Sequence, residues 1–151
     1  MKLAEGLVLR ADAQRRMEQL KQRVLRVAKV QEGDVPAEDP QALLREFEAV
    51  SKELVRLIQR INSTNSQARF QDGSLTDALA RRDILKLREA CYRELAQAAV
   101  ITQSRMTKSE VKFKTTVSIA QVQKQADALA GELRDLDARI QEANWQIELS
   151  E

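Results

Sequence analysis

Residues 111–147 read VKFKTTVSIAQVQKQADALAGELRDLDARIQEANWQI, and the spacing of their apolar side chains changes part-way along. In the first part, apolar or β-branched residues alternate with polar ones; they are Val111, Phe113, Thr115, Val117 and Ile119. Alternation with a period of two is typical of a β-strand with one buried face. We therefore expect a short strand over residues 111–117, directly before the last helix.

From residue 119 the apolar residues recur every three or four positions instead. They are Ile119, Val122, Ala126, Leu129, Leu133, Leu136, Ile140, Ala143 and Ile147. This heptad spacing predicts one long helix, over about residues 119–149, with a coiled-coil seam. Trp145 lies off that seam, and its indole needs an apolar neighbour, either on the first helix of the same chain or on another subunit.

Three earlier segments also have helical spacing, and they predict helices over about residues 2–30, 40–62 and 75–105. The first helix should bury Leu9, Ala13, Met17, Leu20, Val24 and Val27. The second should bury Leu43, Phe47, Val50, Leu54, Leu57 and Ile61. The third should bury Ala80, Ile84, Leu87, Cys91, Leu95 and Ala98.

The fold class that follows is mainly α. We expect an antiparallel bundle of about four long helices, with one short β-strand before the last helix. The chain has 151 residues, a length that predicts a single helical domain over residues 1–151. Its four glycines and two prolines leave little material for turns, which favours few and long elements.

Histidine is absent from the chain, and Cys91 is its single cysteine. Because histidine is the usual general base, and no catalytic motif is recognisable, we expect no enzymatic activity. One cysteine can form neither an internal disulfide nor a cysteine-rich zinc site, and we expect no cofactor. An all-carboxylate magnesium or manganese site stays open, using acids such as Glu46, Asp83 or Asp135.

The charges nearly balance, with 25 basic and 23 acidic residues and a net charge of +2. This balance argues against a dedicated nucleic-acid-binding protein, which usually carries a strong basic excess. A local basic patch is still a candidate site for nucleic acid or an anionic surface; its residues are Arg105, Lys108, Lys112 and Lys114. The same lysines could instead protect the edge of a strand. No apolar window approaches the ~20 residues that span a bilayer, so a membrane partner is not expected. A single cysteine that can form no internal disulfide favours a cytoplasmic location.

The strand at 111–117 needs a partner, because a lone strand cannot satisfy its backbone groups. No other stretch of the chain shows five alternating positions. It pairs with the same strand of a second copy, or folds back on residues 99–105 as a hairpin, or is not a true strand. Pairing between copies is the arrangement we favour, because the long helical seams also call for association. The candidate interface residues are Val111, Phe113, Thr115, Val117 and Trp145.

Several short segments of the chain also resemble a known family. They are Leu3-Ala4-Glu5 through Arg10-Ala11-Asp12, Glu18-Gln19-Leu20, Leu75-Thr76-Asp77-Ala78-Leu79, and the tail from Gln123-Lys124-Gln125-Ala126-Asp127 to Gln141-Glu142-Ala143-Asn144-Trp145. Over nearly its whole length the chain looks like the septicolysin-like family of small bacterial proteins. The family name implies a membrane-damaging protein, and the resemblance brings no catalytic or binding residue with it.

These observations lead to one expected function and two alternatives. We expect a cytoplasmic homo-oligomer of helices that acts as a scaffold or interaction protein. The first alternative is a binder of nucleic acid or anionic surfaces through the basic patch. The second is the membrane damage that the family resemblance implies.

Overall fold

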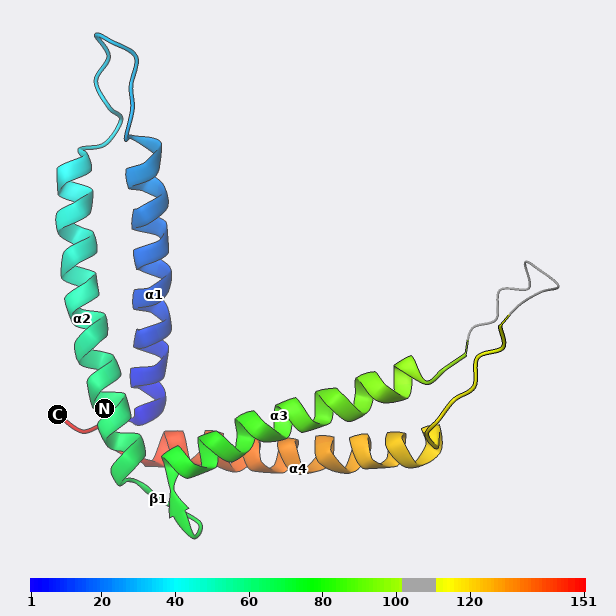
Figure 1. The fold of residues 1–151 in the computed structure, drawn as a ribbon. Helices are drawn as coiled ribbons and strands as arrows, with labels where there is room; N and C mark the ends of the chain where they lie inside the picture. The colour runs from blue at the N-terminus through cyan, green and yellow to red at the C-terminus, as the bar shows by residue number, and fades with distance from the viewer. Residues whose placement is uncertain (102–110) are drawn as a thin grey trace. The chain divides into compact units, whose positions relative to one another are not determined.

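The computed structural model describes residues 1–101 and 111–151 of the chain. Within them, four helices and a two-stranded hairpin follow one another (Figure 1): α1 (Leu3–Arg26), α2 (Pro40–Gln67), β1 (Arg69–Phe70), β2 (Gly73–Ser74), α3 (Leu75–Ala98) and α4 (Ile119–Gln146). The prediction of a mainly α fold with four long helices is confirmed. The chain divides into two compact units, one formed by Met1–Leu75 with Gln141–Glu151 and the other by Thr76–Ile140.

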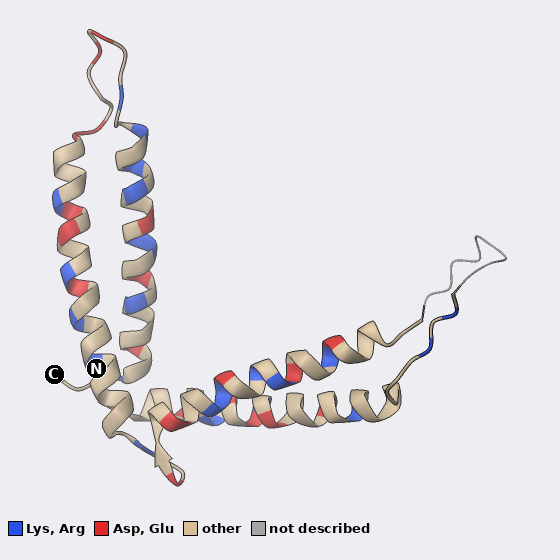
Figure 2. Cartoon of the chain, viewed as in Figure 1, with Lys and Arg blue, Asp and Glu red and all other residues tan. Residues whose placement is uncertain are grey.

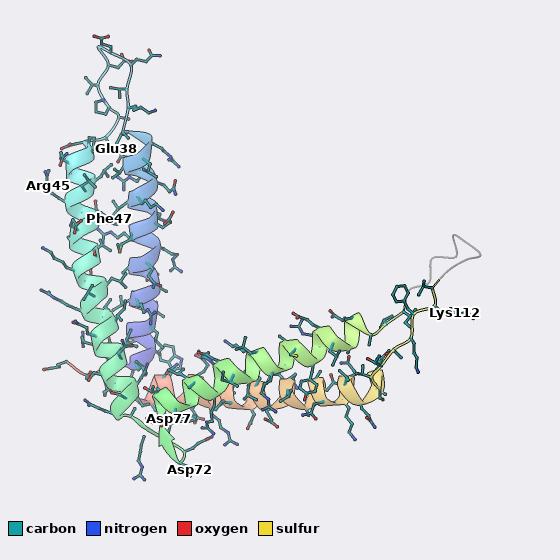
Figure 3. All side chains as sticks on the ribbon, viewed as in Figure 1. Glu38, Arg45, Phe47, Asp72, Asp77 and Lys112 are labelled. Atoms are coloured by element: carbon teal, nitrogen blue, oxygen red, sulfur yellow. The ribbon has the colours of Figure 1, made fainter. Side chains whose placement is uncertain are left out.

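In the first unit α1 and α2 lie side by side and run in opposite directions (Figure 1). Their contact is apolar, and Phe47 points from α2 toward α1 (Figure 3). Its buried centre consists of Ala13, Leu20, Leu43 and Val50, with Met17, Val24, Val27, Phe47 and Leu54 packed around it. The predicted apolar stripes of both helices are thus confirmed, except at Leu9, which is exposed.

The helices do not end where the turn-forming residues suggested. α2 continues to Gln67 instead of ending near residue 62, although it passes through serine, threonine and asparagine residues. The Thr64 hydroxyl donates to the carbonyl of Arg60 at 2.8 Å and the Ser66 hydroxyl to that of Ser63 at 2.8 Å, so these side chains bond back to the helix. The other three helices are shorter than predicted, ending at Arg26, Ala98 and Gln146.

A small hairpin follows α2, where the sequence predicted only turns. β1 and β2 pair antiparallel, with Arg69 opposite Ser74 and Phe70 opposite Gly73. Gln71 takes a positive φ of 51° in the two-residue connection, a conformation that side chains rarely adopt outside turns. Phe70 is buried and its neighbour Arg69 is exposed, so the hairpin has one buried and one exposed side chain on β1.

The two ends of the chain meet within the first unit. The Leu3 amide donates to the Ile147 carbonyl at 2.9 Å, and the Leu149 amide donates to the Met1 carbonyl at 2.8 Å. Leu149 is buried beside Gly6, where an added Cβ would come within 2.8 Å of its Cδ2 atom. Residues 147–149 therefore form a short extended segment on the start of α1, which replaces the predicted last turn of the final helix.

This terminal segment is also held by charge and by α2. The Glu148 carboxylate pairs with the Lys2 ammonium at 2.5 Å and with the chain's own terminal ammonium at 3.2 Å. Hydrogen bonds from these two groups lower the pKa of Glu148. On the α2 side, Ser150 bonds to the Thr64 hydroxyl at 2.9 Å and Arg60 donates to the Ser150 carbonyl at 2.7 Å.

The predicted strand at residues 111–117 is wrong. These residues form no β-strand, and the side chains of Val111 and Phe113 are 83% and 79% exposed. The physical reason is the one that made the strand doubtful: no other described strand lies beside it, and an isolated strand has nothing to satisfy its backbone. The described residues 99–101 form no hairpin with this segment, and residues 102–105 of that predicted hairpin lie outside the described part of the chain.

The second unit contains α3 and most of α4 (Figure 1), and the Arg82 guanidinium of α3 lies 3.4 Å from the Asp137 carboxylate of α4. Of the predicted apolar positions of α4, Ala126, Leu129, Leu136 and Ile140 are buried, whereas Ile119 at the start of the helix is exposed. The coiled-coil character of this stripe stays a prediction. Within the described part of the chain, neither these helices nor α1 and α2 are long and apolar enough to cross a bilayer.

Candidate interaction surfaces

Helix α3 buries a different face from the predicted one. Most of its buried and half-buried positions step regularly by three and four residues, with the half-buried Leu79 and Ala90 beside them: Leu75, Ala78, Arg82, Leu85, Glu89, Tyr92 and Ala96. The residues that were predicted to be buried lie on another face and are all exposed: Ala80, Ile84, Leu87, Cys91, Leu95 and Ala98. The predicted core position of Cys91 is therefore wrong as well.

Two charged residues on the buried face account for the error. Arg82 is only 22% exposed and lies 3.4 Å from Asp137 of α4, while Glu89 accepts from Arg93 one turn later at 3.1 Å. Paired in this way, Arg82 and Glu89 can lay their methylene groups along an apolar contact. The count of apolar residues alone does not reveal this face. The signal that could have revealed it is the three-four spacing of its residues when Arg82 and Glu89 are included.

The exposed set of six residues is called here the α3 stripe, and it is unusually apolar for an outer surface. The side chains of Ile84, Leu87 and Leu95 are 55%, 67% and 39% exposed. From Ala80 to Ala98 the stripe extends ~27 Å along the helix, at ~1.5 Å per residue. A continuous apolar stripe of this kind marks an interaction site more often than scattered surface leucines do.

Charged residues of opposite sign border the stripe on its two sides. At 3.6 residues per turn, Arg88 falls on one edge, which also carries Arg81 and Asp77, and Asp83 and Glu94 fall on the other. Figure 2 shows both signs of charge along this helix. The surface is therefore apolar in the middle and electrically polarised across its width.

Beyond Leu95 the stripe leads into a hollow of about 420 Å³ at the end of α3. Its lining combines the helix end with residues of the predicted strand: Leu95, Ala98, Ala99, Val100, Ile101, Phe113, Lys114, Thr115, Thr116 and Val117. Three of the predicted interface residues, Phe113, Thr115 and Val117, thus gather at one place, next to the strongly exposed Val111.

The predicted basic patch is described only in part. Lys112 and Lys114 are exposed, and Lys112 extends from the segment before α4 (Figure 3). Arg105 and Lys108 lie outside the described residues. Binding of nucleic acid or an anionic surface by this patch stays a prediction.

Trp145, the remaining predicted interface residue, belongs to the first unit. It lines a shallow apolar hollow of about 550 Å³ together with Met1, Glu5, Val8 and Leu9. Of the two neighbours considered for it, the structure supplies the first helix of the same chain. The Trp145 side chain nevertheless stays 60% exposed, so this hollow is a second apolar surface.

The acids considered for a metal site do not converge. Glu46 pairs with Arg16 at 2.6 Å, Asp83 lies 3.7 Å from Arg82, and Asp135 pairs with Arg139 at 3.3 Å. In residues 1–101 and 111–151, no three acidic or cysteine side chains are grouped closely enough to hold a metal ion.

Comparisons with known proteins agree with this architecture. A model of a family of unknown function, DUF6847, matches residues 10–149. The fold is similar to a crystal structure of a functionally unknown conserved protein from Corynebacterium diphtheriae, with a TM-score of 0.93 and 44% identity over 99% of each chain. No curated protein matches the chain significantly. The resemblance to septicolysin-like proteins stays a prediction.

Proposed function

The chain belongs to DUF6847, a family of unknown function. We propose that it is an interaction protein that self-associates through the α3 stripe. The observation that carries this proposal is the exposure of six regularly spaced apolar or small residues on one helix face. The proposal assigns no catalytic role to any residue.

Burial of apolar surface drives association, and the stripe has the shape that a second helix needs. Its residues recur every three or four positions, which is the spacing that presents one continuous seam to a partner helix. A copy of the same chain carries the same seam, so a two-fold pair would cover both stripes at once. Within the stripe, burial of Leu87 should contribute most to the free energy of association, because Leu87 is 67% exposed.

The size of the stripe sets the expected strength of this association. A contact that is one helix wide falls at or below ~1,200 Å² of total buried surface, the small end of specific interfaces. We therefore expect a dissociation constant in the micromolar range, and a mixture of monomer and dimer in dilute solution.

Light scattering of the purified chain between ~1 and ~100 µM tests the proposal, since this range brackets a micromolar dissociation constant. We expect the mean mass to rise toward that of a dimer across this range, and Leu87→Glu to abolish the rise. Leu44→Glu is the matched control, because Leu44 is also exposed, at 41%, but lies on α2. A monomeric mass at every concentration, or an equal effect of both variants, would contradict the proposal.

A further inference from the structure

We infer that two copies pair in parallel and in register along the α3 stripe, so that the acidic edge of each copy faces the basic edge of the other. This inference rests on the proposed self-association and adds its geometry. The apolar stripe alone does not determine whether the two α3 helices pair in parallel or antiparallel, but the charged residues beside it do.

The stripe has an internal repeat of eleven residues. Ala80 is followed eleven residues later by Cys91, Ile84 by Leu95, and Leu87 by Ala98. Eleven residues in three turns give 3.67 residues per turn, close to the 3.6 of a straight helix, so such a stripe hardly drifts around the helix. Two copies can therefore stay in contact along its whole length with very little supercoiling.

The apolar layers are compatible with either direction of pairing. In a parallel pair each residue meets its own copy, so Ile84 lies opposite Ile84 and Leu87 opposite Leu87. In an antiparallel pair centred on Cys91, Ile84 would lie opposite Ala98, and Leu87 would lie opposite Leu95. Both arrangements bury the large side chains, so packing alone leaves the direction open.

The charged edges separate the two arrangements. In a parallel pair the two edges that meet across the seam are opposite ones, so Asp83 and Glu94 of one copy face the edge of the other copy that carries Arg88. In an antiparallel pair each edge meets itself, which brings the Asp83 and Glu94 edges of the two copies together. Asp83 lies 3.7 Å from Arg82 Nε, but its side chain is 67% exposed, so an arginine of a partner can still reach its carboxylate. Complementary edges are favourable and like-charged edges are penalised, which selects the parallel pair.

Site-directed cross-linking tests the direction. Ile84→Cys and Ala98→Cys are made separately in a Cys91→Ser background and treated with a short bis-maleimide. The parallel pair predicts that each variant cross-links to itself, and that a mixture gives no additional product joining position 84 to position 98. The antiparallel pair predicts the reverse, with a product only in the mixture.

Charge reversal provides an independent measurement. We expect Asp83→Arg or Arg88→Asp alone to weaken the dimer about 3- to 10-fold at low salt. The double variant Asp83→Arg/Arg88→Asp should recover most of that loss, because it restores opposite edges with their signs exchanged. High salt should shrink all three effects, since these groups are exposed.

The outcomes separate this inference from the proposed function. A chain that stays monomeric overturns both. A dimer that is sensitive to Leu87→Glu but cross-links only between positions 84 and 98, or that does not recover in the double charge reversal, overturns the parallel pairing and leaves self-association intact.

Discussion

At the scale of single residues, a leucine contributes very differently to the free energy of unfolding on the two sides of one helix. Leu20 and Leu25 both lie on α1, but Leu20 is 1% exposed in the contact with α2 and Leu25 is 59% exposed. We expect Leu20→Ala to lower the free energy of unfolding by about 2–5 kcal/mol, because it removes buried methyl groups and leaves a cavity. Leu25→Ala should change it by less than about 0.5 kcal/mol.

Urea unfolding of both variants measures this difference. Because the two substitutions are chemically identical and share one helix, helix propensity cancels between them. Equal losses of stability would mean that the α1–α2 contact does not bury Leu20 in solution.

A second residue-scale prediction concerns acid. Hydrogen bonds from Lys2 and the terminal ammonium lower the pKa of Glu148, so the folded chain holds its proton more weakly than the unfolded chain does. The stabilisation from this carboxylate is therefore complete above the ordinary glutamate pKa of ~4.3 and is lost as pH falls through the lower folded value. Melting temperatures of the native chain and of Glu148→Gln should differ near neutral pH and converge in acid.

The matched control for this prediction is Glu53→Gln on the exposed surface of α2. It should leave the melting temperature close to that of the native chain at each pH. A gap between the native chain and Glu148→Gln that stays constant down to strongly acidic pH would show that the glutamine disturbs packing rather than an ion pair.

At the scale of whole elements, the start of α2 is fixed by two neighbouring residues. The Asp39 carboxylate accepts from the Gln41 amide at 3.0 Å, and Pro40 begins the helix. We expect Asp39→Ala to cost about 0.5–2 kcal/mol of stability, the usual loss when an N-cap acceptor is removed. Asp39→Ser keeps an acceptor and should retain most of that stability in the same denaturation experiment. If the serine variant is as unstable as the alanine variant, the cap is not the source of the effect.

The sequence predicted those elements best where local signals and packing agree. α2 has a capping residue, a proline at its first position and an apolar stripe that does become its buried face. α3 has two competing faces, and the more apolar one is exposed because the Arg82 and Glu89 face is the one inside the unit. Apolar content alone could not decide between them, since the choice depends on partners such as Asp137 that are distant in sequence.

The expected strand failed for a related reason. Alternation of apolar and polar residues at 111–117 is a local property, whereas a strand exists only if another strand supplies its hydrogen bonds. The same residues still reach the candidate surface, because Phe113, Thr115 and Val117 border the hollow at the end of α3. The sequence thus identified an apolar surface there and assigned it the wrong backbone conformation.

At the scale of the molecule, the last residues of the chain complete a unit that begins with the first ones. The Leu3 amide donates to the Ile147 carbonyl and the Leu149 amide donates to the Met1 carbonyl, and Leu149 buries its side chain beside Gly6. Ser150 adds bonds to α2. The first unit is therefore closed by a segment almost a whole chain length away from α1, which local sequence patterns cannot reveal.

Removing residues 147–151 tests how much this closure contributes. We expect amide hydrogen exchange to speed up in the first turns of α1, because two backbone hydrogen bonds are lost and the burial of Leu149, about 1.5–3 kcal/mol, is lost with them. Deleting Glu151 alone is the control and should change nothing, since this residue is exposed. Exchange in residues 76–140 should stay the same, because they form the other unit. Unchanged exchange at the start of α1 in the shortened chain would mean that α2 alone holds this helix in place.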